Sequence, residues 1–169
     1  TFGTCCRSTW LHRCSVRNGI TGAITRTPCT RAYQRVRSAT SSPSQNRRRE
    51  RRADVIELLK AQYRVQDVID YSGLEPDGLF LEGTGAMVLD HMMRVAYTAR
   101  SNRADPIALE RFCTHFNFEP MVFDANDESG QPVYHTNVMM CVATEFALVG
   151  FDLMQDPVRR EEIRGRLAE

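Results

Sequence analysis

The feature of this 169-residue sequence that most constrains its fold is an internal repeat of about fifty residues. The triplet Arg-Ala-Asp at 52–54 recurs at 103–105, and Asp-Pro at 105–106 recurs at 156–157, with a spacing of 51 in both cases. An acidic residue at these points is typical of a helix start. A repeat of this length predicts a propeller-like or toroidal α/β array. An ordinary α/β fold with similar loop lengths is the alternative.

The stretches between these starts alternate between strand and helix patterns. Apolar residues at helical spacing predict helices at 51–62, 105–116 and 156–167. Runs of apolar and β-branched residues predict strands at 65–71, 79–90, 94–98, 120–124, 134–141 and 146–151. Gly, Pro and Asp predict loops at 73–78 and 126–132. Each unit thus contains two paired strands, a helix and a further strand.

Composition indicates a globular protein, with 42% apolar and 25% charged residues. No apolar run reaches the roughly 20 residues of a membrane-spanning helix. The nearest candidate, 133–151, is interrupted by His135, Asn137 and Glu145. Because no continuous apolar segment of signal-peptide type is present near residue 1, a cytoplasmic location is expected, without a membrane partner.

Charge divides the chain into two differently composed pieces. Residues 1–52 carry 12 basic residues and one acid, a net +11, whereas residues 53–169 carry a net −10. Residues 1–45 show no convincing period, so we predict a disordered or non-native basic segment there and a folded domain at 46–169. Frame-shifted translation of a GC-rich gene would produce such a segment. An arginine-rich arm that binds nucleic acid is the alternative.

The six cysteines do not suggest a metal site, because none forms a CxxC pair or a Cys/His pattern of zinc type. Cys141 lies in an apolar run without a basic neighbour in sequence, and this favours an inert buried thiol over a nucleophile. Met139 and Met140, beside it, are predicted to fill the core of a strand.

Two ionisable residues occupy equivalent places 53 residues apart. Glu82 lies in Leu81–Gly83 and His135 in Tyr134–Thr136, inside apolar strand patterns. A buried carboxylate needs partners, and burial raises its pKa, which suits proton transfer. A histidine is the usual acid or base near neutral pH, and a neighbouring glutamate can orient its ring. A structural glutamate and a histidine bonded to backbone carbonyls are the alternatives.

Three segments of the sequence resemble a known family in order and spacing: Asn46–Arg52 (NRRRERR), Leu79–Asp90 (LFLEGTGAMVLD) and Tyr134–Met140 (YHTNVMM). They are similar to the arginine deiminase-related, citrulline-utilisation hydrolase branch of the guanidine-modifying, amidinotransferase-like superfamily. The resemblance covers about residues 46–169. It implies a partial pentein fold, an α/β propeller, with about two to three ββαβ-type repeats in this chain.

The resemblance also implies a reaction. Family members use a cysteine, a histidine and an acidic residue to attack the guanidino or ureido carbon of arginine or citrulline, through a covalent thioether-type intermediate and without a metal or organic cofactor. Carried over, the acid is Glu82 and the histidine is His135. The family's cysteine lies in a Gly-rich motif of a later module that is not in this chain, so the chain alone is expected to be inactive.

Asn137 bears on the substrate. In the arginine-cleaving relatives an aspartate stands two residues after the histidine, where its charge suits a guanidinium. An amide donates to and accepts from a neutral ureido group, and this favours citrulline. Asn137 bonding only its own turn is the alternative.

The leading hypothesis is therefore a C–N hydrolase of citrulline-like or arginine-like small molecules that releases ammonia. The alternatives are an arginine-rich nucleic-acid-binding protein and a catalytically inactive pentein used for protein contacts. The negative charge of residues 53–169 disfavours a specific nucleic-acid partner. The oligomeric state is left open.

Overall fold

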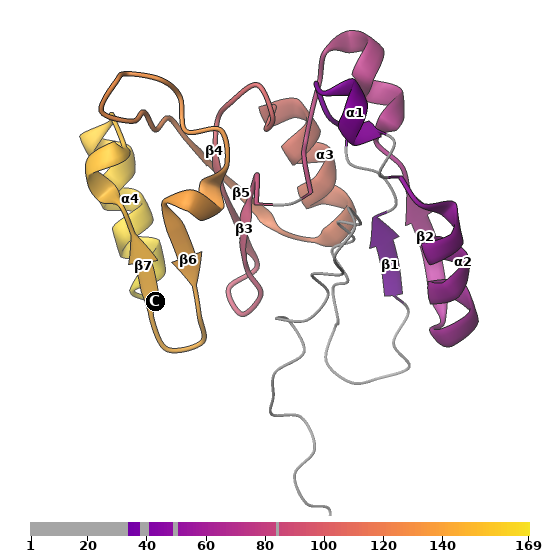
Figure 1. Ribbon diagram of the computed structural model, residues 1–169. Coiled ribbons are helices and arrows are strands. Elements are labelled where there is room, and N and C mark those ends of the chain that lie inside the picture. The colour runs from indigo at the N-terminus through magenta and orange to yellow at the C-terminus, as the bar shows by residue number, and fades with distance from the viewer. Residues whose placement is uncertain (1–33, 38–40, 49–50, 84) are drawn as a thin grey trace, which may run out of the picture.

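The computed structural model describes residues 34–37, 41–48, 51–83 and 85–169 (Figure 1). Most of the segment predicted as 1–45 lies outside these residues, as does the arginine-rich arm. Within that segment the structure describes a strand, β1 (Gln34–Arg37), and two buried serines, Ser41 and Ser42. The predicted boundary at residue 45 stays a prediction.

The fold is mixed α/β, with three small sheets that follow one another along the chain. The first sheet pairs β1 in parallel with β2 (Val65–Ile69). In the second, β3 (Val88–Asp90) runs antiparallel to β4 (Val95–Ala99), and β4 runs parallel to β5 (Glu119–Phe123). The third is an antiparallel pair of β6 (Met140–Val142) and β7 (Ala147–Val149).

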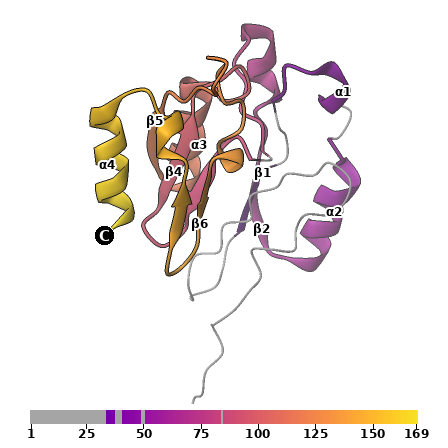
Figure 2. The same cartoon turned by 60° about the vertical axis from the view of Figure 1, so that its left-hand side comes forward.

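Helices connect and flank these sheets. The α-helices are α1 (Gln45–Arg48), α2 (Ala53–Gln62), α3 (Pro106–Phe116) and α4 (Pro157–Leu167), and the 3₁₀ segments are η1 (Ser72–Asp77), η2 (Thr136–Val138) and η3 (Phe151–Leu153). In both views α2 and α4 lie at opposite ends, with the three-stranded sheet between them (Figures 1 and 2). No helix in the described ranges has the length and hydropathy to cross a bilayer.

The repeated Asp-Pro pairs begin α3 and α4, as predicted. The Asp105 carboxylate accepts hydrogen bonds from the backbone N–H groups of Ile107 and Ala108, and Asp156 accepts one from Val158. A proline follows each cap, where its fixed φ suits the first helical residue. α2 begins differently, because its N-cap residue, Arg52, makes no side-chain cap bond and instead pairs with Asp54 in the first turn.

β4 lies between two clusters of buried apolar residues. Side chains alternate along a strand, so Ala96 faces the first cluster while Val95, Tyr97 and Ala99 face the second. The first cluster contains Tyr71, Leu74, Leu81 and the buried face of α3, and the second contains residues of β5 and β6 together with Ile163 of α4. All five residues of β4 are buried, and the high apolar content of this strand follows from its burial on both faces.

Four sequence predictions need correction. The strand predicted at 79–90 is shortened to Val88–Asp90, because the Gly-rich segment turns at Gly85, whose φ is +84°. The strand predicted at 134–141 begins only at Met140, after η2. The loop predicted at 73–78 contains η1. Cys141, predicted to be buried, is exposed on β6, whereas Met139 and Met140 are buried as predicted.

Candidate active site

Glu82 is positioned by a short antiparallel contact just before α3. Its backbone N–H donates to the carbonyl of Arg103 (2.9 Å), and the N–H of Asp105 donates back to Phe80 (2.7 Å). Leu81 forms β-bridges to Ala104 on one side and to Ser41 on the other. The segment 80–82 is thus held between two others, which fixes the direction of the Glu82 side chain.

The Glu82 carboxylate is buried, with only 3% of the residue exposed, and it is hydrogen-bonded on both oxygens. Oε1 accepts from the Ser42 hydroxyl at 2.7 Å. Oε2 lies 2.8 Å from Nε2 of His135 and 3.4 Å from a guanidinium nitrogen of Arg103. A carboxylate removed from water requires such partners.

His135 lies just before η2, with 9% of the residue exposed. Its carbonyl accepts from the N–H of Val138 (3.2 Å), which closes the turn that presents the ring. The Tyr134 ring lies beside the imidazole, with centroids 4.9 Å apart. The structure therefore brings Glu82 and His135 together across 53 residues of sequence.

This geometry defines what the pair can do chemically. When Nε2–H donates to the carboxylate, Nδ1 is the acceptor nitrogen of the ring. The carboxylate then fixes the tautomer and stabilises the imidazolium that forms on proton uptake, as the acid of a catalytic triad does. A buried Glu–His pair of this kind is suited to general acid–base catalysis.

Asn137, the predicted substrate-binding residue, lies two residues further and is exposed. Its backbone N–H donates to the carbonyl of Gly85 at 3.0 Å. A Cβ atom at Gly85 would lie 2.4 Å from the Asn137 side chain, a distance that real Cβ atoms do not tolerate. Glycine at 85 thus leaves room for the Asn137 amide beside the Glu82 segment.

Arg103 is a site residue that the sequence reasoning assigned only to a helix start. Its guanidinium reaches Glu82 and lies over the Tyr134 ring, 4.8 Å from the centroid. The Ser101 hydroxyl donates to the Tyr134 carbonyl (3.0 Å) and accepts from the Arg103 N–H (3.2 Å). The available signal was the place of Arg103, directly before a repeated helix start and 21 residues after Glu82.

Ser42 is the other residue that was missed, because it lies in the segment predicted to be outside the fold. It is held by a charge cluster around Glu75 on η1. The Glu75 carboxylate accepts from the Ser42 N–H (3.1 Å) and forms ion pairs with Arg48 (3.2 Å) and Arg51. Arg48 also donates to the Ser42 carbonyl at 2.9 Å. These bonds fix the backbone from which Ser42 reaches Glu82.

Two cysteines lie within the described residues. Cys113 is buried in the first cluster, where loss of hydration raises the pKa of its thiol to about 12. A thiol with that pKa is almost wholly protonated near neutral pH and is a poor nucleophile. Cys141 is exposed on β6. Cys5, Cys6, Cys14 and Cys29 lie outside the described residues.

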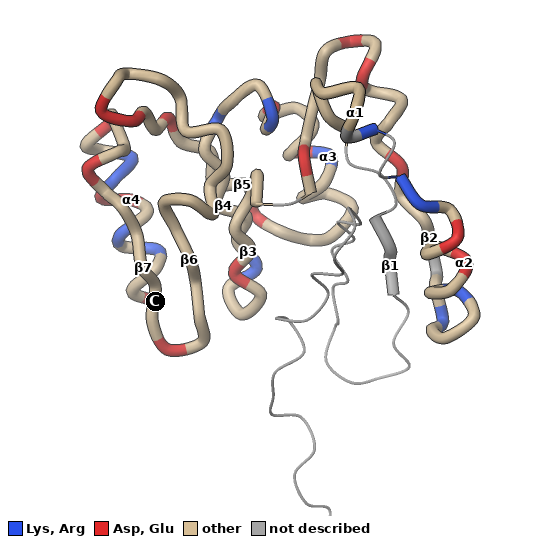
Figure 3. The backbone as a smooth tube through the Cα atoms, viewed as in Figure 1, with Lys and Arg blue, Asp and Glu red and all other residues tan. Residues whose placement is uncertain are grey.

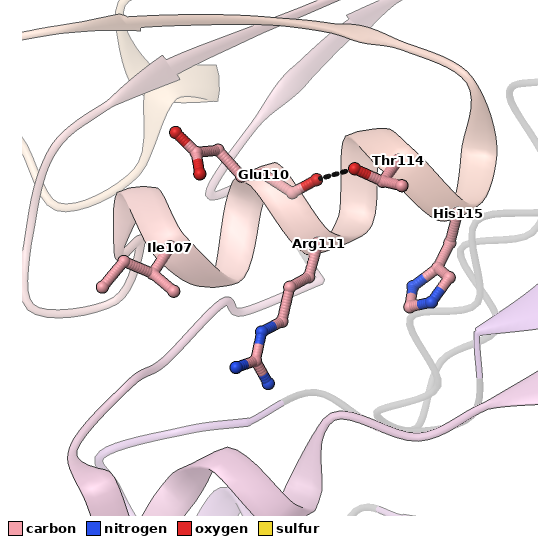
Figure 4. A pocket seen from close by; sticks show the side chains of 5 residues that line it. All are labelled: Ile107, Glu110, Arg111, Thr114 and His115. Carbon is pink, nitrogen blue, oxygen red and sulfur yellow. Dashed lines mark hydrogen bonds between the residues drawn. The ribbon is translucent and has the colours of Figure 1, made fainter.

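A separate pocket lies along one face of α3 (Figure 4). Its described lining consists of Ile107, Glu110, Arg111, Thr114 and His115. His115 contacts the Tyr71 hydroxyl through Nδ1 at 2.9 Å. None of these residues contributes to the Glu82–His135 pair.

Comparison with known proteins places the chain in a family. The family model for N,N dimethylarginine dimethylhydrolase, eukaryotic, matches residues 41–169. The chain therefore belongs to this family, which is part of the pentein superfamily. No curated protein matches the chain.

Solved structures of ArgZ share the fold. ArgZ is an arginine dihydrolase from the ornithine-ammonia cycle in cyanobacteria, and a cysteine-to-serine mutant of its N-terminal domain, bound to substrate, matches with a TM-score of 0.63 and 15% identity. The match covers 89% of this chain and 49% of that one, so the chain spans about half the length of the ArgZ N-terminal domain. An asparagine-to-serine variant of the same domain, covalently bound to a reaction intermediate, matches with a TM-score of 0.59 and 16% identity, over 79% and 45% of the two chains.

Proposed function

We propose that the whole protein is a hydrolase that cleaves a C–N bond in the guanidino or ureido group of an arginine-like substrate and releases ammonia. The observation that carries this proposal is the buried hydrogen bond of 2.8 Å between His135 Nε2 and Glu82 Oε2. The family of the chain supports the reaction class. The fold shared with ArgZ, an arginine dihydrolase, supports an arginine-like substrate.

In this proposal Glu82 and His135 act as one unit. Glu82 orients the imidazole through Nε2, and Nδ1 accepts a proton from the attacking group. The same nitrogen then donates that proton to the departing nitrogen, which leaves as ammonia. Water hydrolyses the group that stays attached to the enzyme.

We propose that the attacking thiolate comes from outside the described residues, and that this chain alone turns over no substrate. The two described cysteines support this view. Cys113 is held as a buried thiol, and Cys141 is exposed on β6. In the described part of the chain neither cysteine hydrogen-bonds to Glu82 or His135. Covalent catalysis at the guanidino carbon requires a thiolate that an adjacent base activates.

Citrulline is the substrate that we propose. Asn137 is neutral, and its amide both donates to and accepts from a ureido group. The Glu82 carboxylate already faces the positive charge of Arg103 at 3.4 Å. A substrate guanidinium bound beside Glu82 would be a second cation there. It would be attracted less strongly by the carboxylate and would be repelled by Arg103, whereas a neutral ureido group would not be repelled.

The test is ammonia release by the complete protein that contains this chain, with citrulline and arginine as substrates. His135→Ala is expected to lower kcat/KM about a hundredfold or more, the usual contribution of a general acid–base residue. Asn137→Asp is expected to shift the preference toward arginine on the order of tenfold, the value of one charge-assisted bond. The isolated 169-residue chain should release no ammonia.

His115→Ala is the matched control, because His115 is a histidine of the same chain that lies on α3 and takes no part in the pair. Its activity should stay at the wild-type level. Full activity of the His135→Ala protein would overturn the assignment. A complete protein with the pair intact but without turnover would support the alternative of a catalytically inactive relative.

A further inference from the structure

Thr136 lies between His135 and Asn137 and is fully buried. Its hydroxyl donates to the carbonyl of Ala86 at 2.6 Å and accepts from the backbone N–H of Ala99 at 2.8 Å. Only a hydroxyl among side chains of this size both donates and accepts in this way. Because Thr136 is fully buried, its hydroxyl is the hydrogen-bond partner that the structure gives to both backbone groups.

The two bonds link the elements that carry the candidate pair. Ala86 lies four residues after Glu82, and Ala99 ends β4, the central strand. The neighbouring N–H of Asn137 donates to Gly85 at 3.0 Å, which adds a second bond to the same segment. The His135 turn is thus tied to residues 85 and 86 by two hydrogen bonds, and the Thr136 side chain ties it to β4 as well.

We propose that Thr136 is a positioning residue that sets the distance between His135 and Glu82. The effect of Thr136 on catalysis rests on the function proposed above. The Glu82 segment is held by its own contacts with Ala104 and Arg103. The His135 turn projects from a short 3₁₀ segment, and the Thr136 hydroxyl anchors this turn from inside the core. A shift of this turn by a fraction of an ångström is enough to weaken a 2.8 Å hydrogen bond.

The experiment compares Thr136→Val, Thr136→Ser and Thr98→Val. Valine keeps the shape of threonine and removes the hydroxyl, while serine keeps the hydroxyl. Thr98 is the matched control because it is also buried, on β4, and its hydroxyl makes one long contact among the described residues, 3.4 Å to the Ala96 carbonyl.

The first readout is ¹⁵N NMR of the His135 ring in the 169-residue chain, assigned with His135→Ala. At a pH at which the ring is neutral, wild type should show the tautomer with the proton on Nε2, which is the one that donates to Glu82. Thr136→Val should show both neutral tautomers, Thr136→Ser should restore the wild-type pattern, and Thr98→Val should not alter it. This readout needs no activity, so it separates the positioning role from the function.

The second readout is steady-state kinetics of the complete protein. Thr136→Val should lower kcat on the order of tenfold to a hundredfold with little change in KM, since misplacement of a catalytic group has that effect. Thr136→Ser should recover most of kcat, and Thr98→Val should leave it unchanged.

Three results would overturn the proposal. One is an unchanged His135 tautomer in Thr136→Val, and another is a failure of serine to restore it. The third is loss of the whole fold in Thr136→Val, since the hydroxyl would then support the core and not the pair. A changed tautomer in a protein whose His135→Ala variant stays fully active would keep the positioning role and refute the proposed function.

Discussion

Helices α3 and α4 begin with the same Asp-Pro cap, but they pack against the protein to different extents. α3 buries Ala108, Leu109, Phe112, Cys113 and Phe116 in the first cluster. α4 buries Ile163 in the second cluster and carries several surface ion pairs, including Arg159–Glu162 and Arg164–Glu161, both at 2.5 Å. Basic and acidic residues occur together along α4 (Figure 3).

This difference separates the local signal that starts a helix from the tertiary packing that stabilises it. A cap and a proline start a helix wherever they occur, because they satisfy N–H groups of the first turn. How much the helix stabilises the fold depends on the neighbours that cover it. The two helices pack in different clusters on opposite faces of β4, and five residues of α3 but only one of α4 are buried there.

Loss of a buried side chain in the core of α3 should destabilise the protein most. Phe112 is fully buried and packs on Phe116 and Phe118, with ring centroids 4.7 and 6.1 Å away. Phe112→Ala should lower the free energy of unfolding by about 3–5 kcal/mol, as burial is lost and a cavity forms. Ile163→Ala on α4 should cost less, near the lower end of about 2–5 kcal/mol. Urea unfolding of the 169-residue chain measures both.

Val158→Ala is the control for this pair, since Val158 lies on α4 and is 76% exposed. Its effect should stay within about 0.5 kcal/mol. An Ile163→Ala protein that loses more than Phe112→Ala would mean that α4, and not α3, provides the main packing.

The sequence predicted the meeting of Glu82 and His135, but not their other partners. The repeat that the sequence predicts would place equivalent residues at equivalent ends of neighbouring units, and the 2.8 Å contact confirms that the two side chains meet. The catalytic role stays a proposal. Ser42 joins them across 40 residues from a segment without periodicity, so no pattern predicts it. Arg103 was recognised in the repeated triplet, but not as a partner of Glu82.

Long-range contacts, which a local sequence pattern does not show, also shorten two predicted strands near the site. Residues 79–90 and 134–141 both have strand-like composition, and in both cases the chain turns before the strand begins. Gly85 adopts positive φ, and the hydroxyl of Thr136 satisfies backbone groups that a strand would pair. A local pattern cannot reveal turns that long-range hydrogen bonds stabilise.

A second prediction compares two glycines with positive φ. Gly85 (+84°) faces Asn137, whereas Gly130 (+80°) has open space around it. Gly130→Ala should cost about 1–2 kcal/mol, the strain of the left-handed region. Gly85→Ala should cost about 2–4 kcal/mol, because the Asn137 side chain must also move. Equal effects in urea unfolding, with unchanged NMR signals of the Asn137 side-chain amide, would contradict the close approach.

The third prediction concerns pH and the two clusters. Burial raises the pKa of Cys113 in the first cluster and of Tyr97 in the second to about 12, from 9.0 and 10.0. The folded state therefore keeps protons that the unfolded chain releases. Stability therefore falls above about pH 9 for Cys113 and above about pH 10 for Tyr97, by about 1.4 kcal/mol per pH unit for each group, until the pH reaches about 12.

Unfolding measured between pH 8 and 11 tests this slope. Cys113→Ala removes the contribution of the first cluster, and Tyr97→Phe removes that of the second. The Tyr97 hydroxyl is buried and has no hydrogen-bond partner among the described residues, so Tyr97→Phe should cost little at pH 7. A slope that neither substitution reduces would exclude both groups as its source.

The smallest expected effect is at the shared caps. Asp105→Ala and Asp156→Ala should each lower stability by about 0.5–2 kcal/mol, because N–H groups of the first turn lose their acceptor. The loss of stability should be larger for Asp105→Ala, since Asp105 accepts from two N–H groups and Asp156 from one. Asparagine at either position keeps an acceptor and should restore most of the lost stability.

If the two caps contribute equally while Phe112→Ala lowers stability more than Ile163→Ala, then the local signal is the same in both helices and only packing distinguishes them. If Asp156→Ala costs clearly more than Asp105→Ala, α4 depends on its cap more than α3 does, because fewer of its residues are buried. Amide exchange at Ile107 and Val158 measures each first turn directly.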